Sequence, residues 1–465
     1  MVGAVDKHLA LIGFMGAGKS KLGRELARLT HRRFVDTDEE IEKRHGPIGE
    51  LFERGEPEFR RIEEQVVAEA LAGPTAVIAL GGGGILSEVT RKRLAVMAFV
   101  AYVQVDTDTA WERVKGSGRP LARDREQFMN LFSDRIDLYE SIANVEGDSA
   151  EDLLLSALRI DVHTTPEGQR WKFGTPPPFS AAAVVADQHV LDLHEFFWAE
   201  GTAIHPIPSG EAAKALSVVQ RLWNELEISR DGWVVGVGGG ATTDVAGFVA
   251  ATHLRGVRWT AVPTTLVGMV DAAIGGKTGI NTEGGKNLAG AFHFPQHVWI
   301  DPALLTTLPA EERRAGMAEV VKTGLLAGGE LWSLPEEKMI RATAAFKSAV
   351  VLSDPYESEG RRAILNLGHT FAHALEAGSD YTLRHGDAVA LGLLAALRLS
   401  GRPTDVVEEV LAPEPVRVDR ERAWDALLRD KKGSLRLVLL GDDGGYVTEV
   451  PKADVKTALD ELIAD

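Results

Sequence analysis

The chain has 465 residues, of which 45% are hydrophobic and 26% are charged, and its formal net charge is −17. This length exceeds one ordinary core and predicts two or three globular domains, while the acidic balance, without a Lys/Arg-rich block, disfavours nucleic acid as a partner. The absence of cysteine excludes disulfides and thiolate catalysis. Because the start lacks signal-peptide anatomy and no apolar run is long enough to span a bilayer, we expect a cytoplasmic protein.

Short β-type runs alternate with amphipathic helical patterns over the first 160 residues. Strands are expected at 9–13, 33–35, 76–80 and 98–105, and helices at Lys19–Leu29 and 58–72. Such alternation is typical of a parallel sheet covered by helices.

A glycine-rich loop follows the first expected strand. Its sequence, Gly13-Phe14-Met15-Gly16-Ala17-Gly18-Lys19-Ser20, satisfies the P-loop pattern between a strand and a helix. Glycines let backbone N–H groups close on a phosphate at the positive end of the helix dipole. Lys19 supplies a charge for the β- and γ-phosphates, and Ser20 supplies a hydroxyl for Mg²⁺. The pattern predicts an ATP site that includes Gly16, Ala17, Gly18, Lys19, Ser20 and Lys21.

Charged side chains that could bind a small acid come next. Asp36 and Asp38 end a strand two residues apart, so the alternation of an extended segment points both carboxylates to the same side. Arg60 and Glu63 share one helix face, where the carboxylate can hold the guanidinium in one pose.

Two further features extend this set. The expected strand at 76–80 ends in the glycine run 81–84, where a ligand can approach the backbone, and arginines occur in a possible lid (Arg119) and after it (Arg135). Each piece alone is usually part of a solvated surface, but their order and spacing together favour an acid-binding pocket. Gluconate-type and nucleoside monophosphate kinases share the phosphate loop but do not need these residues.

This set resembles shikimate kinase over residues 8 to about 158. The resemblance implies ATP-dependent phosphorylation of shikimate, with Arg113 beside adenine and Arg119 as a lid arginine that also contacts ATP. Asp38 would bind the shikimate hydroxyls and orient or deprotonate the attacking one. The implied Mg²⁺ ligands are Ser20 and Asp36, and the implied catalytic residues are Lys19, Asp38 and Arg119. The implied shikimate-binding residues are Asp38, Arg60, Gly81, Gly82, Gly83 and Arg135.

The sequence pattern changes after residue 160. The stretch 161–180 is rich in proline, glycine and threonine without sustained periodicity, which predicts a linker. A second α/β pattern runs over 181–310, and the remainder, 311–465, is mostly helical with one β-like stretch near 436–440. The expected domains are therefore 1–160, 181–310 and 311–465.

A second glycine cluster marks the second α/β region. Gly238-Gly239-Gly240 lies between an expected strand and a helix and suits a pyrophosphate, although glycine-rich strand ends are common in α/β folds. The segments 263–265, 275–281 and 285–287 add hydroxyl, glycine, lysine and amide groups. This combination is typical of a phosphorylated ligand beside a dinucleotide.

Candidate metal ligands occur in the helical region. Glu319 lies in one helical pattern, and His369 and His373 lie one turn apart on another. Three N/O ligands and an open position describe a catalytic zinc site, and the absence of cysteine excludes a thiolate-type structural zinc. A lone histidine is usually structural or solvated. Spacing alone makes His369 and His373 the metal pair.

The blocks 238–248, 263–287, 319–322, 362–376 and His385-Gly386 resemble 3-dehydroquinate synthase, from about residue 181 to the C-terminus. The resemblance implies an NAD- and metal-dependent cyclisation of 3-deoxy-D-arabino-heptulosonate 7-phosphate to 3-dehydroquinate, with release of phosphate. It assigns Glu319, His369 and His385 to Zn²⁺ or Co²⁺ and leaves His373 to the substrate.

The same resemblance implies the other site residues. Those for the substrate are Asp271, Lys277, Asn287, Lys322, Lys347, Arg362, Asn366, His373 and Lys432 or its neighbour Lys431. The catalytic ones among them are Lys277, Lys322, Arg362, Asn366 and His373. Those for NAD are Ser209, Gly210, Glu211, Lys214, Gly240, Ala241, Thr242, Thr243, Asp244, Thr264, Thr265, Lys277, Lys286, Leu304, Leu305, Thr306 and Thr307.

Both resemblances belong to one route to aromatic amino acids, which favours a bifunctional enzyme. The implied fold is a P-loop kinase with a parallel sheet, linked to an α/β NAD-binding domain and an α-helical metal-binding domain. We expect small-molecule substrates, no nucleic acid or membrane partner, and a homodimer formed through the synthase half. Alternatives are that the C-terminal half is another sugar-phosphate cyclase or a polyol dehydrogenase, or that one half is a silent scaffold.

Overall fold

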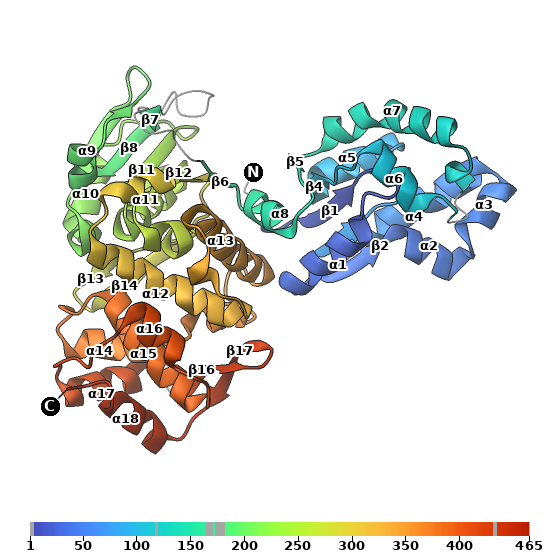
Figure 1. The fold of residues 1–465 in the computed structure, drawn as a ribbon. Coiled ribbons are helices and arrows are strands. Elements are labelled where there is room, and N and C mark those ends of the chain that lie inside the picture. The colour runs from blue at the N-terminus through green and yellow to red at the C-terminus, as the bar shows by residue number, and fades with distance from the viewer. Residues whose placement is uncertain (1–3, 117–119, 164–170, 173–181, 431–434, 465) are drawn as a thin grey trace. The chain divides into compact units, whose positions relative to one another are not determined.

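The computed structural model describes residues 4–116, 120–163, 171–172, 182–430 and 435–464 (Figure 1). The chain divides into two compact units, Met1–Leu158 and Arg159–Asp465. Within the described residues, no helix combines the length and the apolar content that a membrane crossing requires.

The first unit is built on a five-stranded parallel sheet in the order β2-β3-β1-β4-β5. Its strands are β1 (His8–Ile12), β2 (Arg33–Asp36), β3 (Ala76–Ala79), β4 (Ala98–Tyr102) and β5 (Val145–Glu146). Its helices are α1 (Lys19–Leu29), α2 (Thr37–His45), α3 (Ile48–Arg54), α4 (Glu56–Ala72), α5 (Glu88–Met97), α6 (Thr107–Val114), α7 (Arg125–Ile142) and α8 (Ala150–Ala157). The central strands β1, β3 and β4 are fully buried, as expected for a sheet covered on both faces.

The second unit has a six-stranded sheet in the order β10-β8-β11-β12-β15-β6, and every pairing in it is parallel. These strands are β6 (Ile160–Val162), β8 (Ala182–Asp187), β10 (Ala203–Ile207), β11 (Trp233–Gly238), β12 (Arg258–Pro263) and β15 (His297–Ile300). Three smaller pairs are β7 (Trp171–Lys172) with β9 (Phe196–Phe197), the hairpin β13 (Lys277–Thr282) with β14 (Gly285–Phe292), and the hairpin β16 (Arg436–Gly441) with β17 (Gly444–Glu449).

Helices of the second unit fall into two groups. Those that accompany the sheet are α9 (Gln188–Leu193), α10 (Leu216–Glu225) and α11 (Gly240–Thr252), with short turns η2 (Gly210–Lys214), η4 (Gly268–Ala272) and η5 (Pro302–Thr307). The rest are α12 (Ala310–Ala327), α13 (Glu336–Ser353), η7 (Arg361–Asn366), α14 (His369–Gly378), α15 (His385–Leu399), α16 (Asp405–Leu411), α17 (Arg420–Asp430) and α18 (Lys452–Asp460). In Figure 1, α12 runs between the sheet and the helices α14 to α18. The implied fold class, a parallel α/β unit followed by a unit with α/β and helical parts, is confirmed.

The junction between the units differs from the expected linker. The first unit ends at Leu158, two residues before the predicted boundary, and the predicted linker 161–180 begins inside β6. β6 pairs with β15 along the register Val298–Ile160 to Ile300–Val162, so the chain enters the second sheet almost at once. A three-residue edge strand leaves no periodic signal in a sequence. Residues 171–172 form β7, and the remainder of the linker prediction, 164–170 and 173–180, lies outside the described residues.

The expected split of the second unit at residue 310 is not visible as a boundary, since residues 159–465 form one unit. The long helix α12 explains this. It contacts η4 and α13 as well as α15 and α16. The helix begins after Pro309 with two glutamates in its first turn and ends at Gly328, which has a left-handed φ of 72°. Side chains on the buried face of α12 therefore lie between the sheet and the later helices.

A buried histidine in β1 predicts a pH-dependent stability of the first unit. The His8 ring accepts a hydrogen bond from the Ala76 N–H (3.1 Å), so its other nitrogen carries the proton and donates to the Leu71 carbonyl (3.0 Å). Burial lowers the pKa of His8, against the effect of the Leu71 hydrogen bond. Because the unfolded chain then binds more protons than the folded one, stability should fall as pH drops below about 6.5.

The urea midpoint of the first unit is measured by pulse proteolysis of the full chain at pH 7.5 and at pH 5.5. The drop in midpoint between these two pH values should be smaller in His8→Gln, which cannot titrate. An equal drop in wild type and variant would contradict the assignment.

Candidate functional site

The P-loop residues of the first unit form an anion cradle at the start of α1. No side chain among the described residues caps this helix, and an uncapped helix N-terminus suits an anion. Gly16 has a φ of 83°, and a Cβ there would lie 2.8 Å from the Ala110 carbonyl oxygen, so only glycine fits without strain. The buried Lys19 ammonium donates to the carbonyls of Gly13 (2.8 Å) and Phe14 (3.0 Å), which holds it across the loop.

The two predicted aspartates lie beside this cradle. Ser20 Oγ donates to Asp36 Oδ2 at 2.5 Å, so the two side chains expected to hold Mg²⁺ touch. The other oxygen of Asp36 caps α2 by accepting from the Asp38 N–H (3.0 Å) and the Glu39 N–H (3.3 Å). Asp36 is therefore fixed by the helix that it starts, and Asp38 lies in the first turn of that helix.

The glycine run after β3 contacts the predicted acid-binding side chains. A Cβ on Gly81 would lie 2.2 Å from Asp38 Oδ1, and one on Gly83 would lie 1.9 Å from Arg60 Nη1. The Gly82 carbonyl accepts hydrogen bonds from Arg135 Nη1 (3.2 Å). Side chains at 81 and 83 would thus collide with the groups that the sequence assigned to the acid, which explains the glycine run.

The guanidinium groups of Arg60 and Arg135 differ in their contacts and in the direction of their pKa shifts. Arg60 pairs with Glu63 (2.7 Å) and with Glu56 (3.0 Å), and although burial favours a lower pKa, these carboxylates raise the pKa of Arg60. Arg135 is buried, and burial lowers its pKa. Both groups are preorganised as cations beside one glycine loop, Arg60 at Gly83 and Arg135 at Gly82. Such an arrangement suits a small carboxylate.

The structure describes some of the other residues that the sequence predicts for ATP. Arg113 Nη1 donates to the Gly16 carbonyl (2.9 Å), so this arginine lies against the P-loop, and Lys21 is exposed on α1. The lid prediction for Arg119 lies outside the described residues.

The predicted dinucleotide turn of the second unit joins β11 to α11. Gly238 has a φ of 155°, and a Cβ there would lie 2.6 Å from Thr242 Oγ1. The register places Gly238 opposite Pro263, so Thr264 and Thr265 follow at the same edge of the sheet. No side chain caps α11, and the buried hydroxyls of Thr242 and Thr264 have no hydrogen-bond partner among the described residues. Orphaned hydroxyls beside free helix N–H groups fit a bound pyrophosphate.

The other predicted NAD residues form a network around this turn. The Lys214 ammonium pairs with Asp244 and donates to Asn287 Oδ1 (2.7 Å), and Glu211 accepts from the Asn281 amide (2.7 Å). The hairpin β13–β14 is thereby attached to η2. The neighbouring Ser209 donates to Asp187 (2.5 Å), and Gly210 has a φ of 63°. In α11, Thr243 is buried and Ala241 half-buried. In η5, Leu304 and Leu305 are buried, while Thr306 and Thr307 are exposed.

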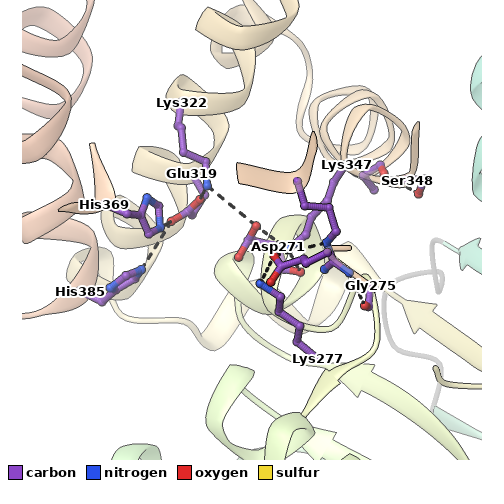
Figure 2. Close-up of polar contacts among 12 residues, drawn as sticks. Asp271, Gly275, Lys277, Glu319, Lys322, Lys347, Ser348, His369 and His385 are labelled. Carbon is purple, nitrogen blue, oxygen red and sulfur yellow. Dashed lines mark hydrogen bonds and ion pairs between the residues drawn. The ribbon is translucent and has the colours of Figure 1, made fainter. Parts of the chain in front are cut away.

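The predicted metal residues converge on one carboxylate. Glu319 on α12, His369 at the start of α14 and His385 at the start of α15 each offer a ligand atom, and these atoms lie within 4.8 Å of one another. The Nε2 atoms of His369 and His385 lie 3.5 Å and 3.6 Å from Glu319 Oε1. Figure 2 shows both imidazoles pointing toward Glu319.

The donor set fits a divalent cation. Both oxygens of Glu319 are buried and accept no well-formed hydrogen bond from the described residues, although Lys322 and the two histidines surround them. Burial alone would raise the pKa of Glu319, but Lys322 and His369 hold it well below its usual range. Two imidazole nitrogens and one carboxylate are ligands that Zn²⁺ and Co²⁺ accept, with a position left for a substrate oxygen.

His373 lies close to this group but is not a member of it. Its ring centroid lies 5.8 Å from that of His369 and 6.5 Å from that of His385. Helix spacing favours His369 and His373 as the metal pair, but the atoms that converge on Glu319 come from His369 and from His385 on the next helix. His373 is exposed beside the three candidate ligand side chains, a position that is compatible with its predicted role as a substrate contact.

An ion-pair chain leads from the metal group toward the sheet. Lys322 contacts Glu319 and lies 4.0 Å from Asp271 Oδ1, and Lys347 lies 2.6 Å from the same oxygen (Figure 2). Burial lowers the pKa of Lys347, against the effect of Asp271, whereas Glu319 and Asp271 overcome burial and raise the pKa of Lys322. Two buried ammonium groups therefore face the same region as the metal ligands.

The remaining predicted substrate residues lie around this chain. Arg362 is buried and donates to the carbonyls of Gly275 (3.1 Å) and Pro355 (2.8 Å), while its Nε has no hydrogen-bond partner within the described part of the chain. Lys277 pairs with Glu357, which also lies 3.9 Å from Arg362 Nε. Asn366 is exposed at the end of η7. The late lysine, Lys432 or Lys431, lies outside the described residues.

Two residues in these sites carry no role in the sequence predictions. Tyr139 Oη donates to the Gly82 carbonyl at 2.5 Å, beside Arg135, and lies four residues after that arginine on α7. Glu376 is buried on α14, where it contacts His385 and Lys286. The signal for Glu376 was its spacing of seven residues from His369, which is two helical turns and the same helix face.

Comparisons with known proteins agree with the division of the chain into a first and a second unit. The family models for shikimate kinase, for the N-terminal part of 3-dehydroquinate synthase and for its C-terminal part match residues 15–157, 204–315 and 316–432. The bifunctional shikimate kinase/3-dehydroquinate synthase of Thermotoga maritima is 30% identical over 463 residues, which cover 91% of this chain and 93% of that protein. The 3-dehydroquinate synthase of Thermobifida fusca is 46% identical over 272 residues, or 51% of this chain and 73% of that protein.

Solved structures match the second unit in fold. A 2-deoxy-scyllo-inosose synthase complexed with carbaglucose-6-phosphate, NAD⁺ and Co²⁺ is 23% identical with a TM-score of 0.54, covering 65% of this chain and 96% of that chain. A 2-epi-5-epi-valiolone synthase from Streptomyces hygroscopicus with NAD⁺ and Zn²⁺ bound is also 23% identical, with a TM-score of 0.55, covering 65% of this chain and 96% of that chain.

Proposed function

The chain belongs to the family of bifunctional shikimate kinase/3-dehydroquinate synthases, and we propose that its two units perform these reactions with the side chains described above. The first unit phosphorylates shikimate with ATP, and the second converts 3-deoxy-D-arabino-heptulosonate 7-phosphate into 3-dehydroquinate with release of phosphate. The observation that carries the assignment is that each family's sequence match coincides with a separate, preorganised site, an anion site in the first unit and a cation site in the second. The kinase site is Lys19 with the 81–83 loop, and the synthase site is Glu319 with its two histidines.

In the kinase unit, catalysis is mainly positioning and neutralisation of phosphate charge. When bound, Mg²⁺-ATP supplies the phosphoryl group, with Ser20 and Asp36 as its metal contacts. Lys19 faces the β- and γ-phosphates, and Asp38 orients or deprotonates the attacking hydroxyl of shikimate. We place the shikimate carboxylate between Arg60 and Arg135, because both guanidinium groups contact the glycine loop that bears on Asp38.

In the synthase unit, the cofactors supply hydride transfer and polarisation of a substrate oxygen when NAD⁺ and a divalent cation are bound. NAD⁺ is held by the uncapped start of α11 and the Thr242 and Thr264 hydroxyls, while Glu319, His369 and His385 hold Zn²⁺ or Co²⁺. Both assignments are proposals for this chain, supported by the orphaned buried oxygens at each site.

The cations beside the metal group bind the charged ends of the substrate. Lys322 and Lys347 are buried beside Asp271, and the Nε of Arg362 has no hydrogen-bond partner among the described residues, so these groups can still donate hydrogen bonds to a bound anion. The phosphate and the carboxylate of the seven-carbon substrate are anions of the kind they require. Asp271 holds both lysines, and His373 lies close enough to the ligand histidines to contact the same substrate.

A substrate panel on the purified chain tests this function against its alternatives. With ATP, shikimate should be phosphorylated faster than gluconate or a nucleoside monophosphate. Among the phosphates, the seven-carbon acid phosphate should release phosphate, whereas sedoheptulose 7-phosphate, the substrate class of the rival cyclases, should not. Turnover of sedoheptulose 7-phosphate in preference to the acid phosphate would identify a cyclitol synthase. The absence of one activity beside a working partner would identify a silent scaffold.

We also propose a homodimer formed through the synthase unit and a cytoplasmic location. Large apolar side chains are exposed on the edge strand β10 and on α10, namely Ile204, Leu216 and Trp223. Such side chains favour a protein contact. The absence of cysteine supports a reducing compartment. Light scattering of the full chain would show twice the monomer mass if the dimer forms.

A further inference from the structure

The imidazole of His385 lies between two glutamate carboxylates. Its Nε2 lies 3.6 Å from Oε1 of Glu319, the proposed metal ligand, and its Nδ1 lies 3.4 Å from Oε1 of Glu376. Glu376 is 5% exposed and lies on α14. One ring nitrogen therefore faces the metal group and the other faces a buried acceptor.

We propose that Glu376 is a positioning residue of the metal centre, which accepts a hydrogen bond from Nδ1 of His385 and thereby fixes Nε2 as the metal-ligating atom. A neutral imidazole carries its proton on one nitrogen only, so an acceptor at Nδ1 decides which nitrogen is free to ligate. Such outer partners also orient the ring and raise its basicity as a ligand. This inference rests on the proposed metal site.

The second histidine of the site supports this interpretation. His369 Nδ1 lies 3.2 Å from the Leu367 carbonyl oxygen, and its Nε2 faces Glu319 in the same way as that of His385. Both ligand histidines thus use Nδ1 for an outer partner and Nε2 for the metal. His369 has a backbone partner beside it in sequence, whereas His385 depends on a side chain from another helix. The His385 side chain is 41% exposed and that of His369 is 12% exposed. A hydrogen-bond partner therefore restricts the ring orientation of His385 more than that of His369.

Glu376 is itself held by its neighbours. Lys286 Nζ, on β14, lies 3.9 Å from Glu376 Oε1 and 4.7 Å from the centroid of the Tyr381 ring. The Tyr381 N–H donates to the Glu376 carbonyl at 2.7 Å, in a turn where Asp380 and Tyr381 both have a positive φ. Two successive non-glycine residues in this region are uncommon. The turn brings the aromatic ring under the ammonium group that balances the buried carboxylate.

Zinc affinity of the full-length chain, measured by chelator competition, tests the proposal. Glu376→Ala should weaken Zn²⁺ binding by roughly 10- to 100-fold. Glu376→Gln should lose less, because its amide oxygen can still accept from Nδ1. The visible spectrum of the Co²⁺-loaded protein should change in Glu376→Ala and be largely restored in Glu376→Gln. The control is Glu311→Gln, which removes a carboxylate that pairs with Arg384, the residue before His385, without contacting the imidazole.

The outcomes separate this proposal from the proposed metal site. If the wild-type chain binds no Zn²⁺, the metal site itself fails. If wild type binds Zn²⁺ and Glu376→Ala binds it equally well, the positioning role is overturned. A loss as large as that of His385→Ala would make Glu376 a direct ligand, and a loss matched by an equal fall in the thermal stability of the metal-free protein would make its role structural. Either result also overturns the proposal.

Discussion

Lys19→Met should reduce the rate of ATP-dependent shikimate phosphorylation by about 100-fold or more while leaving 3-dehydroquinate formation near the wild-type rate. The ammonium group is the only charge that the P-loop itself offers to the β- and γ-phosphates, and removing one preorganised group that stabilises developing charge typically costs about 10²–10³ in rate. Methionine keeps the aliphatic length of the side chain, so the loss reports the charge. Steady-state assays of both activities on one preparation provide the measurement.

The synthase rate in that preparation is an internal control for the amount of chain, because the two units are separately compact. A second control is Lys92→Met, which removes an exposed lysine of α5 that pairs with Glu88. A parallel loss of synthase activity in Lys19→Met would show that the two sites are coupled. Unchanged kinase activity would remove the P-loop assignment.

The proximity of the described residues predicted for the kinase site could be inferred from the sequence because they lie on short consecutive elements. The P-loop pattern fixes a strand, a loop and a helix within about twenty residues, and α1 begins and ends where the pattern predicts. Asp36 and Asp38 follow the next strand, and the glycine run follows the one after it. In a parallel sheet these carboxyl ends meet at one edge, so order along the chain already implies proximity.

The metal group illustrates what spacing could not provide. His369 and His373 share a helix face, so periodicity favours them, but His385 reaches the same carboxylate from the start of α15. That contact depends on how α14 and α15 pack against α12, which is a tertiary feature without a local pattern. Glu376 had a local pattern, two turns after His369, but a glutamate at that spacing is usually a solvated surface residue. Only its burial against His385 distinguishes it.

The glycines of the 81–83 loop show a different limit. The sequence predicted a backbone that a ligand can approach, and the structure adds that the protein's own side chains already make that approach. Asp38 and Arg60 lie where Cβ atoms at Gly81 and Gly83 would have been. The glycines therefore leave room for the carboxylate of Asp38, predicted to be catalytic, and for the guanidinium of Arg60, predicted to bind the acid. This reason for glycine cannot be read from its position after a strand.

Opposite charges follow one another through the synthase site from Lys347 to Glu319, and the imidazole of His385 then lies between Glu319 and Glu376. Three lysines and three carboxylates form the chain, in the order Lys347, Asp271, Lys322, Glu319, Glu376 and Lys286. The lysine and carboxylate charges cancel before a cation binds. A divalent cation adds positive charge that an anionic substrate can neutralise, so metal and substrate should strengthen each other's binding.

His385→Ala should therefore abolish both tight metal binding and synthase turnover, with a rate loss of at least about 100-fold, since even outer-shell partners of a metal typically cost 10- to 100-fold. His373→Ala should retain the metal while losing turnover, because its ring lies outside the ligand group but beside it. Metal content after dialysis, measured by elemental analysis, and turnover after addition of Zn²⁺ or Co²⁺ distinguish the two variants. Full metal content in His385→Ala together with an empty His373→Ala would restore the assignment that helix spacing favours. Kinase activity should be unchanged in both, because neither histidine belongs to the first unit.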